Sequence, residues 1–92
     1  MLCWVKSALD ANSAVNLRAP FLLAQAFDRQ LPDAPDGDAD GPRADIINLN
    51  DIRALRPGAD HFAYTISKVG LHGLTRSLAL SLAPRVRVNE LA

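Results

Sequence analysis

The sequence is poor in cysteine, has no excess of either charge and contains no long apolar run. Its single cysteine, Cys3, cannot form an internal disulfide. Because 10 Lys and Arg residues balance 10 Asp and Glu residues, nucleic acid and anionic membrane surfaces are not expected as partners. The apolar runs are too short to span a bilayer, and residues 1–9 lack the layout of a signal peptide. We therefore expect a soluble, cytoplasmic protein with no membrane partner.

Clusters of metal-ligating residues are also missing from the sequence. No set of His, Cys, Asp and Glu residues has the spacing of a metal site. The stretch 32–43 is rich in aspartate, but it lacks the carboxylate spacing and the terminal Glu of an EF-hand calcium loop. The 92 residues suffice for one small domain, in which this stretch is expected to be a solvated surface loop.

The first half of the chain predicts a helix followed by a strand. Apolar residues recur at helical spacing over residues 10–31, and Pro20 either kinks this helix or restarts it as a first-turn proline. Residues 44–51 are typical of a short buried strand, because Ile46, Ile47 and Leu49 favour extended backbone.

The second half predicts a long helix and another strand. The helix begins at about residue 61 or 62, with Asp60 as a candidate N-cap, and it runs to residue 83, where Pro84 ends it. Residues 85–89 form the next short strand. The order strand, loop, helix, strand is that of the βαβ unit in a parallel sheet, whose ligands bind beyond the carboxyl ends of the strands.

A Tyr-x-x-x-Lys motif, Tyr64 to Lys68, lies just inside the second helix. Residues four apart share one helix face, so the phenol and the ammonium can point into the same space. A cation near a phenol favours the phenolate and moves a pKa of about 10 toward the range of a general acid/base. The alternative is a surface helix that carries an ordinary Tyr and Lys.

The order and spacing of several segments resemble the short-chain dehydrogenase/reductase family. These segments are Val15-Asn16-Leu17-Arg18-Ala19-Pro20-Phe21-Leu22-Leu23, Ile46-Ile47-Asn48-Leu49, Tyr64-Thr65-Ile66-Ser67-Lys68, Gly73-Leu74-Thr75-Arg76-Ser77-Leu78-Ala79 and Arg85-Val86-Arg87-Val88-Asn89. Together they cover residues 12–89, most of the chain.

The resemblance implies an α/β fold, the central to C-terminal part of a doubly wound, Rossmann-type parallel sheet. It implies NADP or NAD as cofactor, with NADP favoured, and hydride transfer to or from a small-molecule substrate. By the same resemblance, Tyr64 exchanges a proton with the substrate. Lys68 lowers the Tyr64 pKa and binds the nicotinamide ribose, and Asn16 holds a water of a proton relay.

One residue departs from the family pattern. Asp51 stands where most members carry a serine that donates a hydrogen bond to the substrate carbonyl. An ionised carboxylate only accepts hydrogen bonds, and its charge opposes phenolate formation at Tyr64. The pteridine reductases of this family are similar in having an aspartate there, so a pterin-like substrate reduced at a ring C=N bond is our leading expectation. The alternatives are a ketone or alcohol substrate, or a shifted loop in which Asp51 is a solvated turn residue.

The chain also lacks a glycine motif of this family. None of its five glycines forms the Gly-x-x-x-Gly-x-Gly turn that lets backbone approach a cofactor pyrophosphate. We therefore expect residues 1–92 to be a partial domain, without the Gly-rich N-terminal βαβ unit and the C-terminal substrate segment. The alternative is a catalytically inactive remnant or a helix-mediated interaction module.

Small residues recur along the second helix, at Gly70, Gly73, Ser77 and Ser81. They permit close approach of another helix, and the resemblance implies a homo-oligomer for the full-length protein. The competing interpretation is packing within the subunit. His72 lies on the same helix, where a place at the surface or in an interface is expected.

Overall fold

The computed structural model describes residues 6–32, 44–58 and 61–92 of the chain. Three helical segments follow one another without a gap, α1 (Lys6–Ser13), the π-helical η1 (Ala14–Arg18) and α2 (Ala19–Gln30). After them come β1 (Ala44–Leu49), a short 3-10 helix η2 (Ile52–Ala54), α3 (Phe62–Leu82) and β2 (Val86–Leu91). The predicted order of two helical regions and two strands is confirmed.

The π-helical segment η1 has a local cause in Pro20. Proline has no N–H, so residue 20 cannot donate to the carbonyl of Asn16 as an α-helix requires. Instead, the N–H of Ala19 bonds to the carbonyl of Ala14, five residues back, which widens this turn. Pro20 lies in the first turn of α2, which agrees with the alternative of a first-turn proline.

Helix α3 begins and ends at backbone signals. At its start His61 adopts the left-handed region, with φ 55° and ψ 46°, and its side chain makes no cap hydrogen bond. The predicted cap, Asp60, lies outside the described residues. At its end Ala83 is extended, with ψ 148°, because the residue before a proline avoids the helical region.

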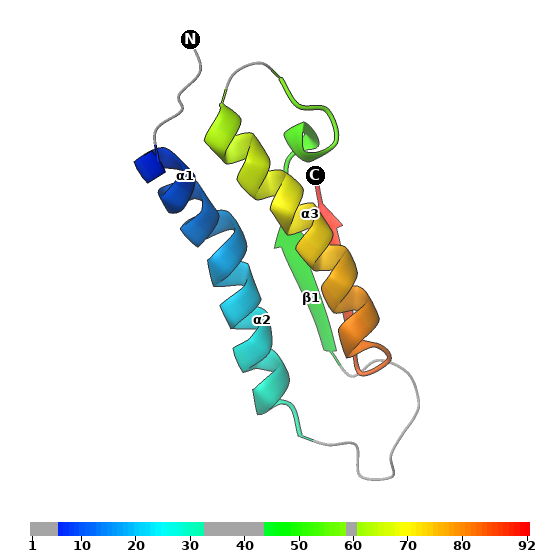
Figure 1. Cartoon of the computed structure of the whole chain (residues 1–92). Helices are drawn as coiled ribbons and strands as arrows, with labels where there is room; N and C mark the ends of the chain where they lie inside the picture. The colour runs from blue at the N-terminus through cyan, green and yellow to red at the C-terminus, as the bar shows by residue number, and fades with distance from the viewer. Residues whose placement is uncertain (1–5, 33–43, 59–60) are drawn as a thin grey trace.

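The two strands are neighbours in one parallel sheet, with Ala44 opposite Val86 and Leu49 opposite Leu91. Helix α3 connects them and covers one face, on which Val86 and Val88 are buried. Figure 1 shows both strands running toward the end of the molecule where η2 lies and α3 begins. The carboxyl ends of the strands, where parallel sheets bind ligands, therefore meet the N-terminal turn of α3.

The other face of β1 is not buried, and here the expectation of a buried strand was wrong. The residues of β1 alternate between partly buried and exposed, and Ile47 and Leu49 keep 58% and 68% of their surface exposed. The reason is that no other described element covers this face. With one covered face and a single partner strand, β1 corresponds to part of a doubly wound sheet.

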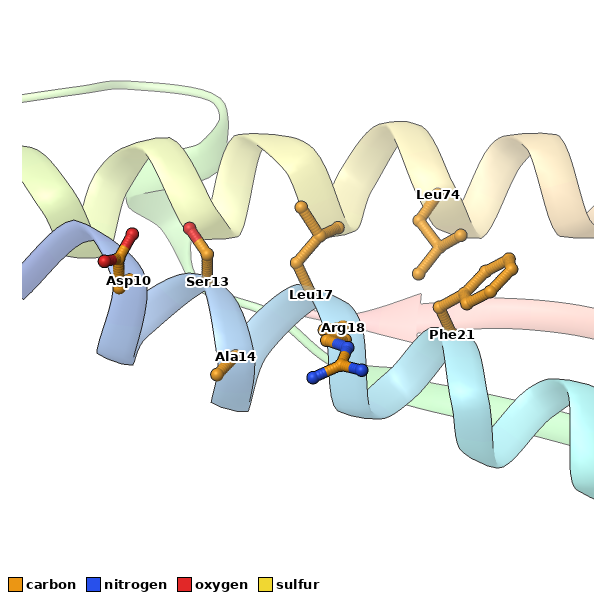
Figure 2. A pocket seen from close by; sticks show the side chains of 7 residues that line it. All are labelled: Asp10, Ser13, Ala14, Leu17, Arg18, Phe21 and Leu74. Atoms are coloured by element: carbon orange, nitrogen blue, oxygen red, sulfur yellow. The ribbon is translucent and has the colours of Figure 1, made fainter.

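A groove separates η1 and its flanking helices from α3 (Figure 2). Leu17 and Phe21 from one side and Leu74 from the other point into it, and its volume is about 460 Å³. At one point the helices are in close contact, because a side chain at Gly70 would meet the Leu17 methyl groups at 3.1 Å. Gly70 thus serves packing within the subunit, whereas a side chain at Gly73 would meet nothing within 4 Å.

The helices of the described ranges include none that combines the length and the apolar character of a membrane span.

Candidate active site

Asp51 and Tyr64 meet at the carboxyl end of β1. Asp51 follows the strand and caps η2, where its Oδ1 atom accepts the N–H of Arg53 at 2.9 Å. Tyr64 lies in the first turn of α3 and donates its hydroxyl to Asp51 Oδ2 at 2.8 Å. The loop is therefore not shifted away from the motif, and the carboxylate and the phenol form one unit.

The hydrogen bond between these two groups contributes to shifts in both pKa values. The pKa of Asp51 lies below its usual value of 3.8, because its carboxylate accepts the backbone N–H of Arg53 and the hydroxyl of Tyr64. The pKa of Tyr64 lies above 10.0, because its hydroxyl donates to Asp51 and because the phenol is partly desolvated. In the described arrangement the pKa of Tyr64 is therefore raised and not lowered, and the lowering expected from Lys68 stays a prediction.

Lys68 lies beside the Tyr64 ring but bonds to the strand. Its Nζ atom is 5.7 Å from the ring centroid and donates to the carbonyl oxygen of Leu49, the last residue of β1, at 2.9 Å. An ammonium has three N–H donors, so this bond leaves capacity for ligand oxygens. Lys68 is thus oriented across the carboxyl end of the strand.

Asn16 reaches the site through Ser67. From η1, its Nδ2 atom donates to Ser67 Oγ at 3.1 Å, and that hydroxyl donates to the backbone carbonyl of Tyr64 at 2.6 Å. Ser67 is 1% exposed. The structure therefore brings Asn16 to the residue beside Lys68, and its role as the holder of a water stays a prediction.

Ser67 and the backbone amide of Arg53 take part in the site but were not predicted from the sequence. A signal existed for the second, because an aspartate at the end of a strand often accepts the N–H two residues later in an Asx-turn. Ser67 gave no such signal, since its partner Asn16 is 51 residues away along the chain.

His72 lies on α3 outside this unit, and 33% of its side chain is exposed, which fits the expected place at the surface. Its ring is half-buried and its Nδ1 atom contacts the carboxylate of Glu90 on β2. Within the described ranges, no group of three or more His, Cys, Asp and Glu residues is placed to hold a metal ion.

Comparison with known proteins identifies the family of the chain. Residues 5–92 match the family model described as enoyl-(acyl carrier protein) reductase. The chain belongs to the short-chain dehydrogenase/reductase family. The doubly wound fold expected from the sequence is confirmed by solved structures of the same type.

Among the similar members of this family is the dihydromonapterin reductase of Enterobacter sp. (strain 638). It is 40% identical over 88 residues, which are 96% of this chain and 35% of that protein. The dihydromonapterin reductase of Escherichia coli K12 is 38% identical over 78 residues, which are 85% of this chain and 30% of that protein. The chain thus spans about a third of the length of the relatives it matches.

A solved structure with the same architecture is that of FolM alternative dihydrofolate reductase 1 from Brucella suis in complex with NADP. It superposes with a TM-score of 0.83 at 36% sequence identity, over 98% of this chain and 34% of that one. The corresponding protein from Brucella canis, also complexed with NADP, gives a TM-score of 0.81 at 37% identity.

Proposed function

We propose that residues 1–92 carry the acid/base centre of an NADP-dependent reductase that acts on the C=N bond of a pterin-like ring. The observation that carries this proposal is the 2.8 Å hydrogen bond from Tyr64 to Asp51. Relatives named dihydromonapterin reductase and neighbours solved with NADP support it. Because the chain spans about a third of those proteins, the proposal includes further residues that complete the domain, among them a Gly-rich βαβ unit and a substrate segment.

The substrate class follows from the chemistry of Asp51. Each of its oxygens already accepts one hydrogen bond, from Arg53 N–H and from the Tyr64 hydroxyl. An ionised carboxylate offers about four lone-pair sites, so Asp51 can accept further N–H groups but cannot donate to a carbonyl. A pterin-like ring presents such N–H donors along one edge, whereas a simple ketone presents none. The carboxylate therefore favours the nitrogen heterocycle.

The donors of the site fit one part of NADP. The Lys68 ammonium and the Tyr64 hydroxyl both lie at the carboxyl end of β1, where a ribose hydroxyl could accept from the first and bond to the second. The glycines of this chain do not form the Gly-x-x-x-Gly-x-Gly turn that would bind the pyrophosphate of NADP. When bound, NADPH supplies the hydride.

The residues of the chain handle the proton. Asp51 orients the substrate by accepting its N–H groups, and this competes with the bond from Tyr64. The released phenol then donates its proton to the ring nitrogen of the C=N bond. The Lys68 ammonium, 5.7 Å from the ring centroid, stabilises the phenolate that remains. Asn16 supports this arrangement through Ser67, and we propose that it also holds the water that returns the proton.

The test measures NADPH oxidation by the full-length protein that contains this chain, with dihydropterins and with simple ketones as substrates. We expect activity with the dihydropterin and a loss of at least about a hundredfold in kcat for Tyr64→Phe, which keeps the ring but has no proton to give. Asp51→Ser, the matched control that restores the usual family residue, is expected to lose pterin reduction and to retain cofactor binding. Equal activity of Asp51→Ser and wild type on pterins would contradict the proposal.

The proposal extends to a cytoplasmic, homo-oligomeric protein. Two features of α3 support a further helix partner. A side chain at Gly73 would meet nothing within 4 Å, and an apolar groove lies between Leu74 of α3 and Leu17 and Phe21. Sedimentation of the full-length protein measures the oligomeric state, and a monomer at micromolar concentration would contradict it.

A further inference from the structure

A second polar cluster, which reaches Asp51 through the preceding residue Asn50, joins both strands to α3. It consists of Glu90 on β2, His72 on α3 and Asn50, the residue that follows β1. One carboxylate oxygen of Glu90 accepts the Asn50 side-chain amide, and the other contacts His72 Nδ1. All three side chains lie on the face of the sheet that α3 covers.

The position of Glu90 makes its partners necessary. Along β2 the side chains of Val86 and Val88 are buried beneath α3, and position 90 follows at the same strand period. A third apolar residue would continue this buried row, but the sequence places a carboxylate there whose side chain is only 20% exposed. A charge with so little water requires hydrogen-bond partners, and Asn50 and His72 supply one for each oxygen.

Asn50 transmits the position of Glu90 to Asp51. Its side-chain Nδ2 bonds to Glu90, and its backbone N–H donates to the carbonyl of Leu91 at 2.6 Å. Its side-chain Oδ1 accepts the backbone N–H of Asp51 at 2.9 Å. Asn50 is therefore held to β2 at two points and holds the backbone of Asp51 at a third.

We propose that Glu90 is a positioning residue for the Asp51–Tyr64 pair and acts through Asn50, with His72 fixing its carboxylate. The kinetic part of this inference rests on the proposed function, whereas the geometric part does not. The chain of contacts runs from α3 through β2 to the end of β1 and returns to α3 at Tyr64. It fixes the place at which the Asp51 carboxylate meets the phenol.

Tyr64 reports on this link by itself, because it is the only tyrosine of the chain. The experiment follows the tyrosinate absorbance of the full-length protein as pH rises. If further tyrosines are present in the full-length protein, the difference from Tyr64→Phe isolates this signal. We expect Glu90→Ala and Asn50→Ala each to shift the pKa of Tyr64 downward, since the Asp51 loop loosens and its bond to the phenol weakens.

Two matched variants separate positioning from general destabilisation. Glu90→Gln retains an acceptor for Asn50 and is expected to keep the pKa of Tyr64 where wild type has it. Asp45→Asn weakens the 2.8 Å pair between Asp45 and Arg87, which joins the same two strands at their opposite end. This control is also expected to leave Tyr64 unchanged. Far-ultraviolet circular dichroism establishes that each variant is folded, and if Glu90→Ala is not, Asn50→Ala decides.

The outcomes distinguish this inference from the proposed function. An unchanged Tyr64 pKa in folded Glu90→Ala or, where that variant does not fold, in Asn50→Ala would overturn the positioning role, whatever the activity. A downward shift without any pterin reduction by wild type would leave the positioning role intact and reject the proposed function. If both hold, kcat of Glu90→Ala is expected to fall about tenfold with little change in KM for NADPH, because orientation of the acid is lost and cofactor binding is not.

Discussion

The hydroxyl of Tyr64 donates to the carboxylate of Asp51 across 2.8 Å, and this bond joins the start of α3 to the end of β1. The two residues are separated by 13 positions in the sequence and by a 3-10 turn in the structure. Their pairing keeps the phenol protonated and the carboxylate ionised. The resting state of the site is therefore a neutral acid held by an anionic acceptor.

The pH dependence of this pair can be measured directly. Because the folded pKa of Tyr64 lies above 10.0, the stability from its protonated form is complete below about pH 10 and is lost as pH rises through the folded value. Because the folded pKa of Asp51 lies below 3.8, its contribution is complete above about pH 4 and is lost as pH falls through the folded value. We expect Asp51→Ser to lower the pKa of Tyr64 in a tyrosinate titration. A pKa that stays at the wild-type value would show that desolvation, and not the carboxylate, sets it.

The link between Asn16 and Ser67 should be worth a measurable coupling energy. The two side chains share a 3.1 Å hydrogen bond between η1 and α3, and Ser67 is almost fully buried. A double-mutant cycle with Asn16→Ala and Ser67→Ala, followed by chemical denaturation, is expected to give a coupling of about 1 kcal/mol. If Asn16→Ala reduces kcat much more than Ser67→Ala does, Asn16 has a role in the reaction beyond this bond. Equal kinetic effects would reduce its role to packing.

Gly70 and Gly73 offer a matched pair of substitutions in one helix. Alanine is favoured over glycine by about 1 kcal/mol in a helix interior, so Gly73→Ala, which meets nothing within 4 Å, should stabilise the isolated chain by up to that amount. Gly70→Ala should gain less, because the new methyl group stands 3.1 Å from Leu17. Thermal unfolding compares the two. If subunits of a full-length oligomer pack against the small residues of α3, the order of stability of the two variants is expected to reverse, because Gly73→Ala would weaken association.

The isolated chain should be marginally stable. Its described sheet has two strands, so each has an unpaired edge, and Ile47, Leu49 and Leu91 on the uncovered face are more than half exposed. The radius of gyration is 15.6 Å, whereas a compact domain of this length has about 12 Å. We expect broad thermal unfolding and association that grows with concentration, measured by circular dichroism and light scattering. A sharp, cooperative transition of a monomer would contradict this.

Residues that act locally could be assigned from the sequence. Apolar spacing identified both helical regions, Pro84 placed the end of α3, and the four-residue spacing of Tyr64 and Lys68 placed both on one helix face. Asp51 follows a predicted strand, and this position was enough to place it at the carboxyl end of the sheet, where the site lies. Short-range signals of this kind depend on helix and strand periods and on proline, which the sequence contains explicitly.

Only the tertiary structure decided which charge controls Tyr64. The spacing alone favoured Lys68, but Lys68 donates to Leu49 while Asp51 takes the phenol, so the pKa of Tyr64 rises. The place of Glu90 was likewise decided by strand pairing, which sets it opposite Asn48 and within reach of Asn50. Contacts between residues 13 to 51 positions apart depend on how the strands pair and on which side chains compete for each partner. That competition is resolved in space, where distance and burial determine which hydrogen bond is formed.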